Sequence, residues 1–173
     1  SELPIKDIFL SVIPDNQLLK SPTVREIKDH LDAEVLYGQE QLDNQVFKFS
    51  IAAMQVHNYL QKITENSLVI TPGDRGEIIL STLTAHLSDN YPKISGILLT
   101  TGLSPEESII KLLDGFSNPI PILMTKTSTY ETAMALKEIH SYVIPENYKK
   151  IEESLKVFEK YVNLEGLEDK ISK

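Results

Sequence analysis

The residues of this chain best suited to hold an anion lie between Gly73 and Gly76, where an apolar run ends and an amphipathic run begins. The full junction reads Thr71-Pro72-Gly73-Asp74-Arg75-Gly76. Main-chain amides at the beginning of a helix favour negative ligands, and an arginine at the same place adds a bidentate donor. The sequence therefore predicts an anion-binding junction between a strand and a helix.

Two further loops carry polar residues directly after apolar runs. Because the carboxyl ends of parallel strands line one edge of a sheet, where ligands of open α/β folds usually bind, we expect the three loops to meet there. Lys126 adds a positive charge to this edge. The candidate ligand-binding residues are Thr71, Gly73, Asp74, Arg75, Gly76, Thr100, Thr101, Gly102, Lys126 and Thr127.

Helix capping explains much of the same polarity. Ser104 and Ser128 are each followed three residues later by glutamate, which is the spacing of a capping box, and Asp74 is a further candidate N-cap. Capping does not explain Arg75. An arginine in a first helical turn is disfavoured by the helix dipole, and a carboxylate or a bound anion beside it offsets this cost. Two interpretations of Arg75 remain open: an ion pair, within the protein or between subunits, and a contact with a ligand.

The sequence contains no recognisable arrangement for catalysis or metal binding. It has no cysteine, and His30, His57, His86 and His140 lack metal-ligand spacing. Neither a Gly-x-Ser-x-Gly elbow nor a Gly-x-x-x-x-Gly-Lys-Ser/Thr phosphate loop occurs. We therefore expect no catalytic residue, no metal and no cofactor in this segment.

Charge and hydropathy restrict the partners and the location. The 173 residues carry a formal net charge of -8, which opposes binding to nucleic acid and to anionic membranes. No apolar run approaches the roughly 20 residues of a membrane helix, and the first residues lack the pattern of a signal peptide. The expected location is cytoplasmic.

Hydropathy patterns predict an α/β fold with a largely parallel sheet, helices on both faces and repeated strand-helix units. Strands are expected over residues 33–37, 46–54, 67–71, 94–101 and 120–125. A first helix begins at Ser21-Pro22, and further helices are expected over 57–63, 76–87, 105–116 and 130–143. The strand over 67–71 lacks polar alternation, which indicates burial on both faces.

Three regions are expected along the chain. Residues 1–20 form an arm or the remnant of an upstream domain, 21–144 the α/β domain, and 145–173 a helix and tail. The helix, over 146–162, places Ile151, Leu155, Phe158 and Val162 on one stripe. This stripe fits packing against the α/β domain, a dimer contact, or attachment to a neighbouring domain.

The strand-end loops resemble the DRTGG domain. The resemblance rests on residues 69–75, followed by 98–102, and extends over 22–143; it departs at Leu103, where the family normally has another glycine. Members of this family are non-catalytic modules attached to phosphate acetyltransferases, to P-loop domains similar to dethiobiotin or cobyrinic acid synthetases, and to CBS-domain proteins. Residues 9–15 resemble the closing strand of such a P-loop domain, which implies that a P-loop domain precedes this segment in a phosphotransacetylase-like protein.

The resemblance implies a non-catalytic regulatory or assembly domain, expected to be a homodimer, whose loops sense a nucleotide or another phosphorylated metabolite. The alternative is a purely structural dimerisation module that binds no small molecule. Phosphate acetyltransferase activity within this segment is a third hypothesis, and its only support is the identity of the domains that accompany related modules.

Overall fold

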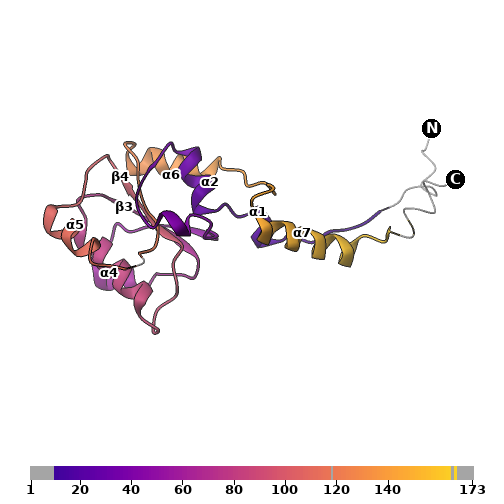
Figure 1. The fold of residues 1–173 in the computed structure, drawn as a ribbon, viewed down its shortest axis with the longest axis horizontal. Coiled ribbons are helices and arrows are strands. Elements are labelled where there is room, and N and C mark those ends of the chain that lie inside the picture. Colours follow the sequence, from indigo (N-terminus) through magenta and orange to yellow (C-terminus); the bar gives the residue numbers. More distant parts are fainter. Residues whose placement is uncertain (1–9, 118, 165, 167–173) are drawn as a thin grey trace. The chain divides into compact units, whose positions relative to one another are not determined.

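The computed structural model of this chain describes residues 10–117, 119–164 and 166, and its contacts divide it into two units (Figure 1). The larger unit consists of residues 20–141. The smaller unit combines the described parts of residues 1–19 and 142–173. All candidate ligand-binding residues belong to the larger unit.

A five-stranded sheet forms the centre of the larger unit. Its strands are β1 (Glu34–Tyr37), β2 (Lys48–Ile51), β3 (Ser67–Pro72), β4 (Gly96–Thr100) and β5 (Ile122–Met124), in the spatial order β1-β5-β4-β3-β2. The neighbours from β2 to β5 are parallel, whereas β1 runs antiparallel to β5. The predicted α/β fold with a largely parallel sheet is confirmed.

Helices cover both faces of this sheet, as predicted (Figure 1). One face packs against α2 (Val24–His30) and α6 (Thr129–Lys137), and the other against α3 (Val56–Leu60), α4 (Gly76–Leu87) and α5 (Glu107–Leu113). The short helix α1 (Gln17–Lys20) precedes α2, and a 3₁₀ helix (Gln39–Gln41) follows β1.

The central strands β3 and β4 are buried on both faces, which confirms the expectation for the run without polar alternation. In β3, Leu68 and Ile70 belong to the core beneath α2 and α6, while Val69 belongs to the core beneath α3, α4 and α5. All three side chains are fully buried. Each apolar residue of β3 therefore stabilises one of two separate cores.

Several elements are shorter than predicted, because apolar residues that flank a strand also belong to the core. β2 has four residues rather than the nine of 46–54, and Val46 is buried outside it. Ile94 and Ile120 are likewise buried ahead of β4 and β5. Helix α6 ends at Lys137 rather than at residue 143. Hydropathy reports burial, whereas the ends of an element depend on its hydrogen bonds.

A capping box at Thr23, rather than Ser21-Pro22 alone, begins the first predicted helix. The Thr23 hydroxyl oxygen accepts from the Glu26 amide at 3.2 Å, and the Glu26 carboxylate accepts from the Thr23 amide at 2.7 Å. The same carboxylate accepts a hydrogen bond of 2.8 Å from the Ser141 hydroxyl. The residue thus joins the beginning of α2 to the chain that follows α6.

The smaller unit is built around α7 (Tyr148–Tyr161), close to the predicted range of 146–162. The Asn16 side-chain amide donates a hydrogen bond of 2.7 Å to the Glu153 carboxylate on this helix. On the predicted apolar stripe, Leu155 and Phe158 are 56% and 42% exposed within the described chain. Of the segment compared with a closing strand, Phe9 lies outside the described residues, and residues 10–15 form no strand.

A buried hydrogen bond joins two helices on one face of the sheet. The hydroxyl oxygens of Tyr59 in α3 and Thr82 in α4 lie 2.8 Å apart. Burial raises the pKa of Tyr59 from 10.0 to about 12. Because the folded state holds the phenol proton more tightly, this contribution to stability is present below pH 10 and is lost as the pH rises towards 12.

We predict that Tyr59→Phe weakens the pH dependence of the free energy of unfolding between pH 10 and 12. The wild-type chain should lose on the order of 2–3 kcal/mol from this group across the interval. The variant lacks that loss but is about 1 kcal/mol less stable at neutral pH, because Thr82 loses its partner. Urea unfolding at several pH values measures both effects, with Tyr91→Phe as an exposed control. The prediction would be contradicted if the free energy of unfolding fell equally in wild type and Tyr59→Phe between pH 10 and 12.

Candidate functional site

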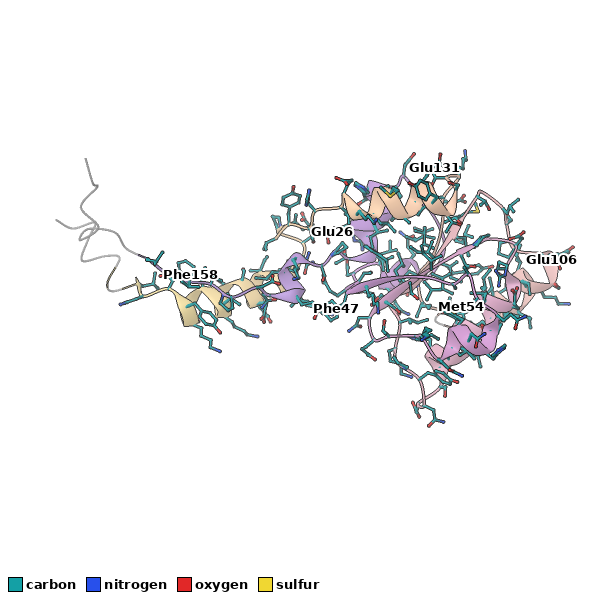
Figure 2. All side chains as sticks on the ribbon, turned by 180° about the vertical axis from the view of Figure 1, so that it is seen from behind. Glu26, Phe47, Met54, Glu106, Glu131 and Phe158 are labelled. Carbon is teal, nitrogen blue, oxygen red and sulfur yellow. The ribbon has the colours of Figure 1, made fainter. Side chains whose placement is uncertain are left out.

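The candidate site is the carboxyl-terminal edge of the sheet. Because β2, β3, β4 and β5 are parallel, their connections to α3, α4, α5 and α6 all leave from this edge. Figure 2 labels three residues near the helix ends of these connections: Met54 ahead of α3, Glu106 ahead of α5, and Glu131 in the first turn of α6. The predicted site residues are divided among the last three connections and the element ends beside them, so the fold brings their backbone segments to one edge.

Two glycines at this edge allow close packing between neighbouring connections. A Cβ atom added to Gly73 would lie 1.7 Å from the Leu103 carbonyl oxygen, and the Gly73 amide donates to the Thr100 carbonyl oxygen at 3.3 Å. A Cβ at Gly76 would lie 2.8 Å from Cγ1 of Ile109 in α5. Packing against the β4–α5 connection and α5 therefore accounts for both glycines without a ligand.

The loops after β4 and β5 are joined through their backbones. The amides of Thr101 and Gly102 donate to the carbonyl oxygens of Thr127 and Thr125, at 2.8 and 2.9 Å. Thr101 and Gly102 have φ values of 71° and 66°. This conformation is unfavourable for a β-branched residue and costs on the order of 1–3 kcal/mol. Lys126 is exposed, and a Cβ at Gly102 would lie 3.6 Å from its Cγ atom.

Hydroxyl groups at the edge hydrogen-bond to one another. The Thr100 and Thr129 hydroxyl oxygens are 2.7 Å apart, and those of Thr127 and Thr132 are 2.8 Å apart. These pairs connect β4 and the β5–α6 loop to the first turns of α6. Two of the candidate ligand-binding hydroxyls are thus engaged in structural hydrogen bonds, and their partners are threonines rather than a general base.

Arg75 is the N-cap residue of α4 and forms an ion pair within the protein. Its Nε atom donates to Oε1 of Glu77 at 2.5 Å, and its Nη2 atom donates to the Met54 carbonyl oxygen at 3.3 Å. The side chains of Arg75 and Glu77 are 31% and 52% exposed. The hydrogen bond from Arg75 lowers the pKa of the Glu77 carboxyl. The pair is therefore a surface interaction, open to water.

Sequence reasoning did not identify Glu77, although the signal was available. The residue lies two positions after Arg75, in the first turn of α4, where a carboxylate is favoured by the helix dipole. Of the two interpretations left open for Arg75, the structure shows the ion pair within the protein. The order of residues in the sequence does not reveal that the Met54 carbonyl oxygen, from the β2–α3 connection, accepts a hydrogen bond from the same guanidinium.

The capping box predicted at Ser128 is confirmed. The Ser128 hydroxyl oxygen accepts from the Glu131 amide at 3.3 Å, and the Glu131 carboxylate accepts from the Ser128 amide at 2.9 Å. The hydrogen bond from the Ser128 amide lowers the pKa of the Glu131 carboxyl. One of the three predicted caps therefore begins its helix as expected.

The caps predicted at Ser104 and Asp74 are wrong. Helix α5 begins at Glu107, so its N-cap is Glu106 and Ser104 lies two residues too early. In α4 the N-cap position is occupied by Arg75, one residue after Asp74. Neither helix has a side-chain cap hydrogen bond. The spacing of capping residues in the sequence therefore did not locate the beginning of either helix.

Thr71 lies beneath this edge and has an unusual hydroxyl group. The residue is fully buried, and its Oγ1 atom has no hydrogen-bond partner among the described residues. It pairs with Leu99 in the register of β3 and β4. A buried hydroxyl without a partner normally costs about 1–3 kcal/mol, so Thr71 lowers the stability of the edge rather than raising it.

Within the described ranges, no group of three His, Asp or Glu side chains is placed so that it could hold a metal ion. In those same ranges, no helix has both the length and the apolar character needed to cross a membrane.

We predict that Gly73→Ala destabilises the domain by more than about 2 kcal/mol, because the new methyl group would overlap the Leu103 carbonyl and force the two connections apart. Gly115→Ala is the matched control, since its Cβ would lie 3.3 Å from the Leu112 carbonyl oxygen. Thermal unfolding of both variants measures the difference. Equal melting temperatures for the two variants would show that the connections are free to separate.

We also predict that Thr71→Val leaves stability unchanged or raises it by about 1 kcal/mol, because it replaces an unpartnered buried hydroxyl with a methyl group of similar size. Thr82→Val is the control, since it removes the hydrogen bond to Tyr59 and should cost about 1 kcal/mol. Denaturant unfolding of the two variants provides the test. A loss of stability in Thr71→Val equal to that in Thr82→Val would contradict the absence of a partner.

Comparison with protein families confirms the resemblance drawn from the loops. The sequence model of the DRTGG domain matches residues 26–139. A phosphate acetyltransferase of Nitratidesulfovibrio vulgaris is 44% identical over 153 residues, which cover 88% of this chain and 22% of that protein. A phosphate acetyltransferase of Synechocystis sp. is 42% identical over 163 residues, or 94% of this chain and 23% of that protein. The chain thus spans less than a quarter of the length of these curated relatives.

A solved structure has the same fold. It comprises the CBS and DRTGG domains of the regulatory region of a Clostridium perfringens pyrophosphatase, in complex with the activator diadenosine tetraphosphate. The similarity covers 69% of this chain and 47% of that chain, with a TM-score of 0.53 and 24% sequence identity. At this identity the comparison concerns the fold alone.

Proposed function

Because this chain belongs to the DRTGG domain family, we propose that it is a non-catalytic regulatory or assembly domain of a phosphate acetyltransferase-like protein. In this proposal a P-loop domain precedes residue 21 in the full-length chain, and the strand-end edge binds a nucleotide or another phosphorylated metabolite. The support comes from the family, from the composition of the edge and from the environment of Arg75.

The hydroxyl groups at the edge favour a non-catalytic role. A nucleophilic serine or threonine needs an adjacent base, held in position by a third group. Thr100 and Thr127 instead hydrogen-bond to other threonines. Their arrangement stabilises the two loops and provides no path for a proton. The acetyl transfer named for the relatives is therefore assigned, in this proposal, to other parts of the full-length protein.

The observation that carries the ligand-binding part of the proposal is the exposed ion pair between Arg75 and Glu77 at the beginning of α4. Exposed ion pairs contribute only about 0–1 kcal/mol, so a phosphate group that displaces Glu77 loses little. The phosphate gains a bidentate guanidinium and the main-chain amides of the first helical turn. The exchange of one anion for another is thus energetically accessible at this position.

The structural neighbour supports the class of ligand. That protein is a regulatory region, and its activator is a nucleotide that carries four phosphate groups. A phosphorylated ligand also suits a guanidinium next to a helix N-terminus. The strained backbone of Thr101 at the same edge is typical of sites whose conformation is maintained for a function.

A structural dimerisation module is the second candidate, and a different observation favours it. Apolar side chains are exposed along the same edge and the adjoining strand β2: Ile51 and Met54 are each 50% exposed, Leu103 is 46% exposed, and Tyr130 is 74% exposed. Apolar surface of this kind suits a contact with a second copy. In that case Arg75 contributes to the interface, and no small molecule is needed.

We predict that Arg75→Ala weakens the binding of phosphorylated ligands at least tenfold while the fold is retained, because the guanidinium is the main cationic contact. Isothermal calorimetry with ATP, acetyl phosphate and acetyl-CoA measures this. Arg25→Ala is the matched control: Arg25, in the first turn of α2, forms an ion pair of 2.8 Å with the exposed Asp43, away from the edge.

Light scattering of the same variants separates the two candidates. If Arg75→Ala halves the molecular mass and wild type releases no heat with any of the three ligands, the domain is an assembly module and the ligand-binding part of the proposal fails. If mass and stability are unchanged and affinity is lost, the structural candidate fails instead.

A further inference from the structure

A groove runs between the edge strand β1 and helix α5, and its far end reaches Ser104 and Pro105 of the β4–α5 connection. It consists of two hollows of about 410 and 280 Å³, and both are lined by Leu36, Tyr37 and Asp114. The first hollow also contacts Leu113, Phe116 and Glu40, and the second contacts Ile110. These seven residues define the β1–α5 groove. The exposed lining of its first hollow is more polar than apolar, whereas that of its second hollow is mainly apolar.

A bulge in β1 shapes this groove. Val35 pairs with Leu123 and Tyr37 pairs with Ile122, so Leu36 is an extra residue opposite β5. Val35 packs against the core beneath α2 and α6, whereas Leu36 and Tyr37 both pack against the core on the α5 side. The bulge therefore turns two consecutive side chains towards α5, where regular alternation would place only one.

The outer edge of β1 is available for a further strand. Within the described residues, β1 pairs only with β5 and ends the sheet. Such an edge presents main-chain donors and acceptors, and addition of an extended peptide is a common way to use them. The hydrogen bond of 2.7 Å from the Tyr37 hydroxyl to Asp114 lies between the two hollows. Two hollows separated in this way suit two side chains on one face of an added strand.

The charges around the groove select the partner. Glu40 and Asp114 are exposed and line the first hollow, and Glu34 is exposed on β1. Among the residues that the structure describes, no lysine, arginine or histidine lines either hollow. Like charges brought face to face are unfavourable, so a second copy of this chain, with the same acidic border, is a poor occupant. A basic segment is complementary.

We propose that the β1–α5 groove binds a partner protein through an extended segment that pairs with β1 as an added strand and carries a basic and an apolar side chain, two positions apart, on its α5-facing side. The apolar side chain enters the second hollow, and the lysine or arginine enters the first, beside Asp114 and Glu40. This site is independent of Arg75 and of any phosphorylated ligand.

Fluorescence anisotropy of the 173-residue chain with a labelled peptide of sequence TKTLTKTL, in which lysines and leucines share one face of a strand, tests the proposal, with TETLTETL as the acidic control. Asp114→Lys and Glu40→Lys should each weaken binding of the basic peptide at least tenfold. Asp114→Asn keeps an acceptor for the Tyr37 hydroxyl but removes the charge, so it should weaken binding as well. Asp89→Lys changes the same charge at a fully exposed position elsewhere and should have no effect.

Backbone methylation tests the added strand itself. In a peptide that pairs with β1 along one side, every second amide points to β1 and the others point to solvent. N-methylation of the amides that point to β1 should abolish binding. N-methylation of the amides that point to solvent should leave binding unchanged. Selection of displayed eight-residue peptides on the chain should likewise enrich sequences with a basic and an apolar residue two positions apart.

The proposal is overturned if neither TKTLTKTL nor any displayed peptide binds, if Asp114→Lys binds as well as Asp89→Lys, or if both methylated sets behave alike. It is also overturned if light scattering shows a dimer that Asp114→Lys converts to a monomer, because a second copy would then occupy the groove.

Discussion

The parallel pairing of β3 with β4 is the interaction on which the rest of the domain depends. Both strands are buried on their two faces, and their register runs from Leu68 opposite Gly96 to Pro72 opposite Thr100. Burial on both faces requires helices on both sides, and parallel pairing requires each connection to cross back over the sheet. The meeting of the loops at one edge follows from these two requirements.

Close packing between those loops limits which of their groups can contact another molecule. Gly73 is held against the Leu103 carbonyl, and the Thr101 amide is bonded to the next loop. The edge is therefore a set of connections that support one another, rather than an open cleft with free functional groups. The charged side chains that the edge offers to another molecule include the partly exposed Arg75 and the exposed Lys126, together with exposed carboxylates at Asp74, Glu77, Glu106, Glu107 and Glu131. This arrangement suits recognition and contact better than covalent chemistry.

The two borders of the domain differ in kind because β1 is antiparallel. A parallel fifth strand would need a crossover, whereas β1 follows α2 directly and pairs at the opposite side from β2. Its bulge at Leu36 and the neighbouring α5 produce a groove that extends from Glu40 to Ser104 and Pro105 of the β4–α5 connection. One sheet thus offers a strand-end edge with a guanidinium and, beside β1, a groove flanked by carboxylates.

Much of the fold was readable from the sequence because burial leaves a pattern in it: the uninterrupted apolar run of β3 identified a strand that is buried on both faces. The glycine-flanked Arg75 similarly marked the family. Only the tertiary structure decided the partner of Arg75, the failed caps at Ser104 and Asp74, and the orientation of β1. Those features depend on contacts between segments distant in sequence, such as Gly73 with Leu103 and Arg75 with Met54, and hydropathy records burial without recording which surfaces meet.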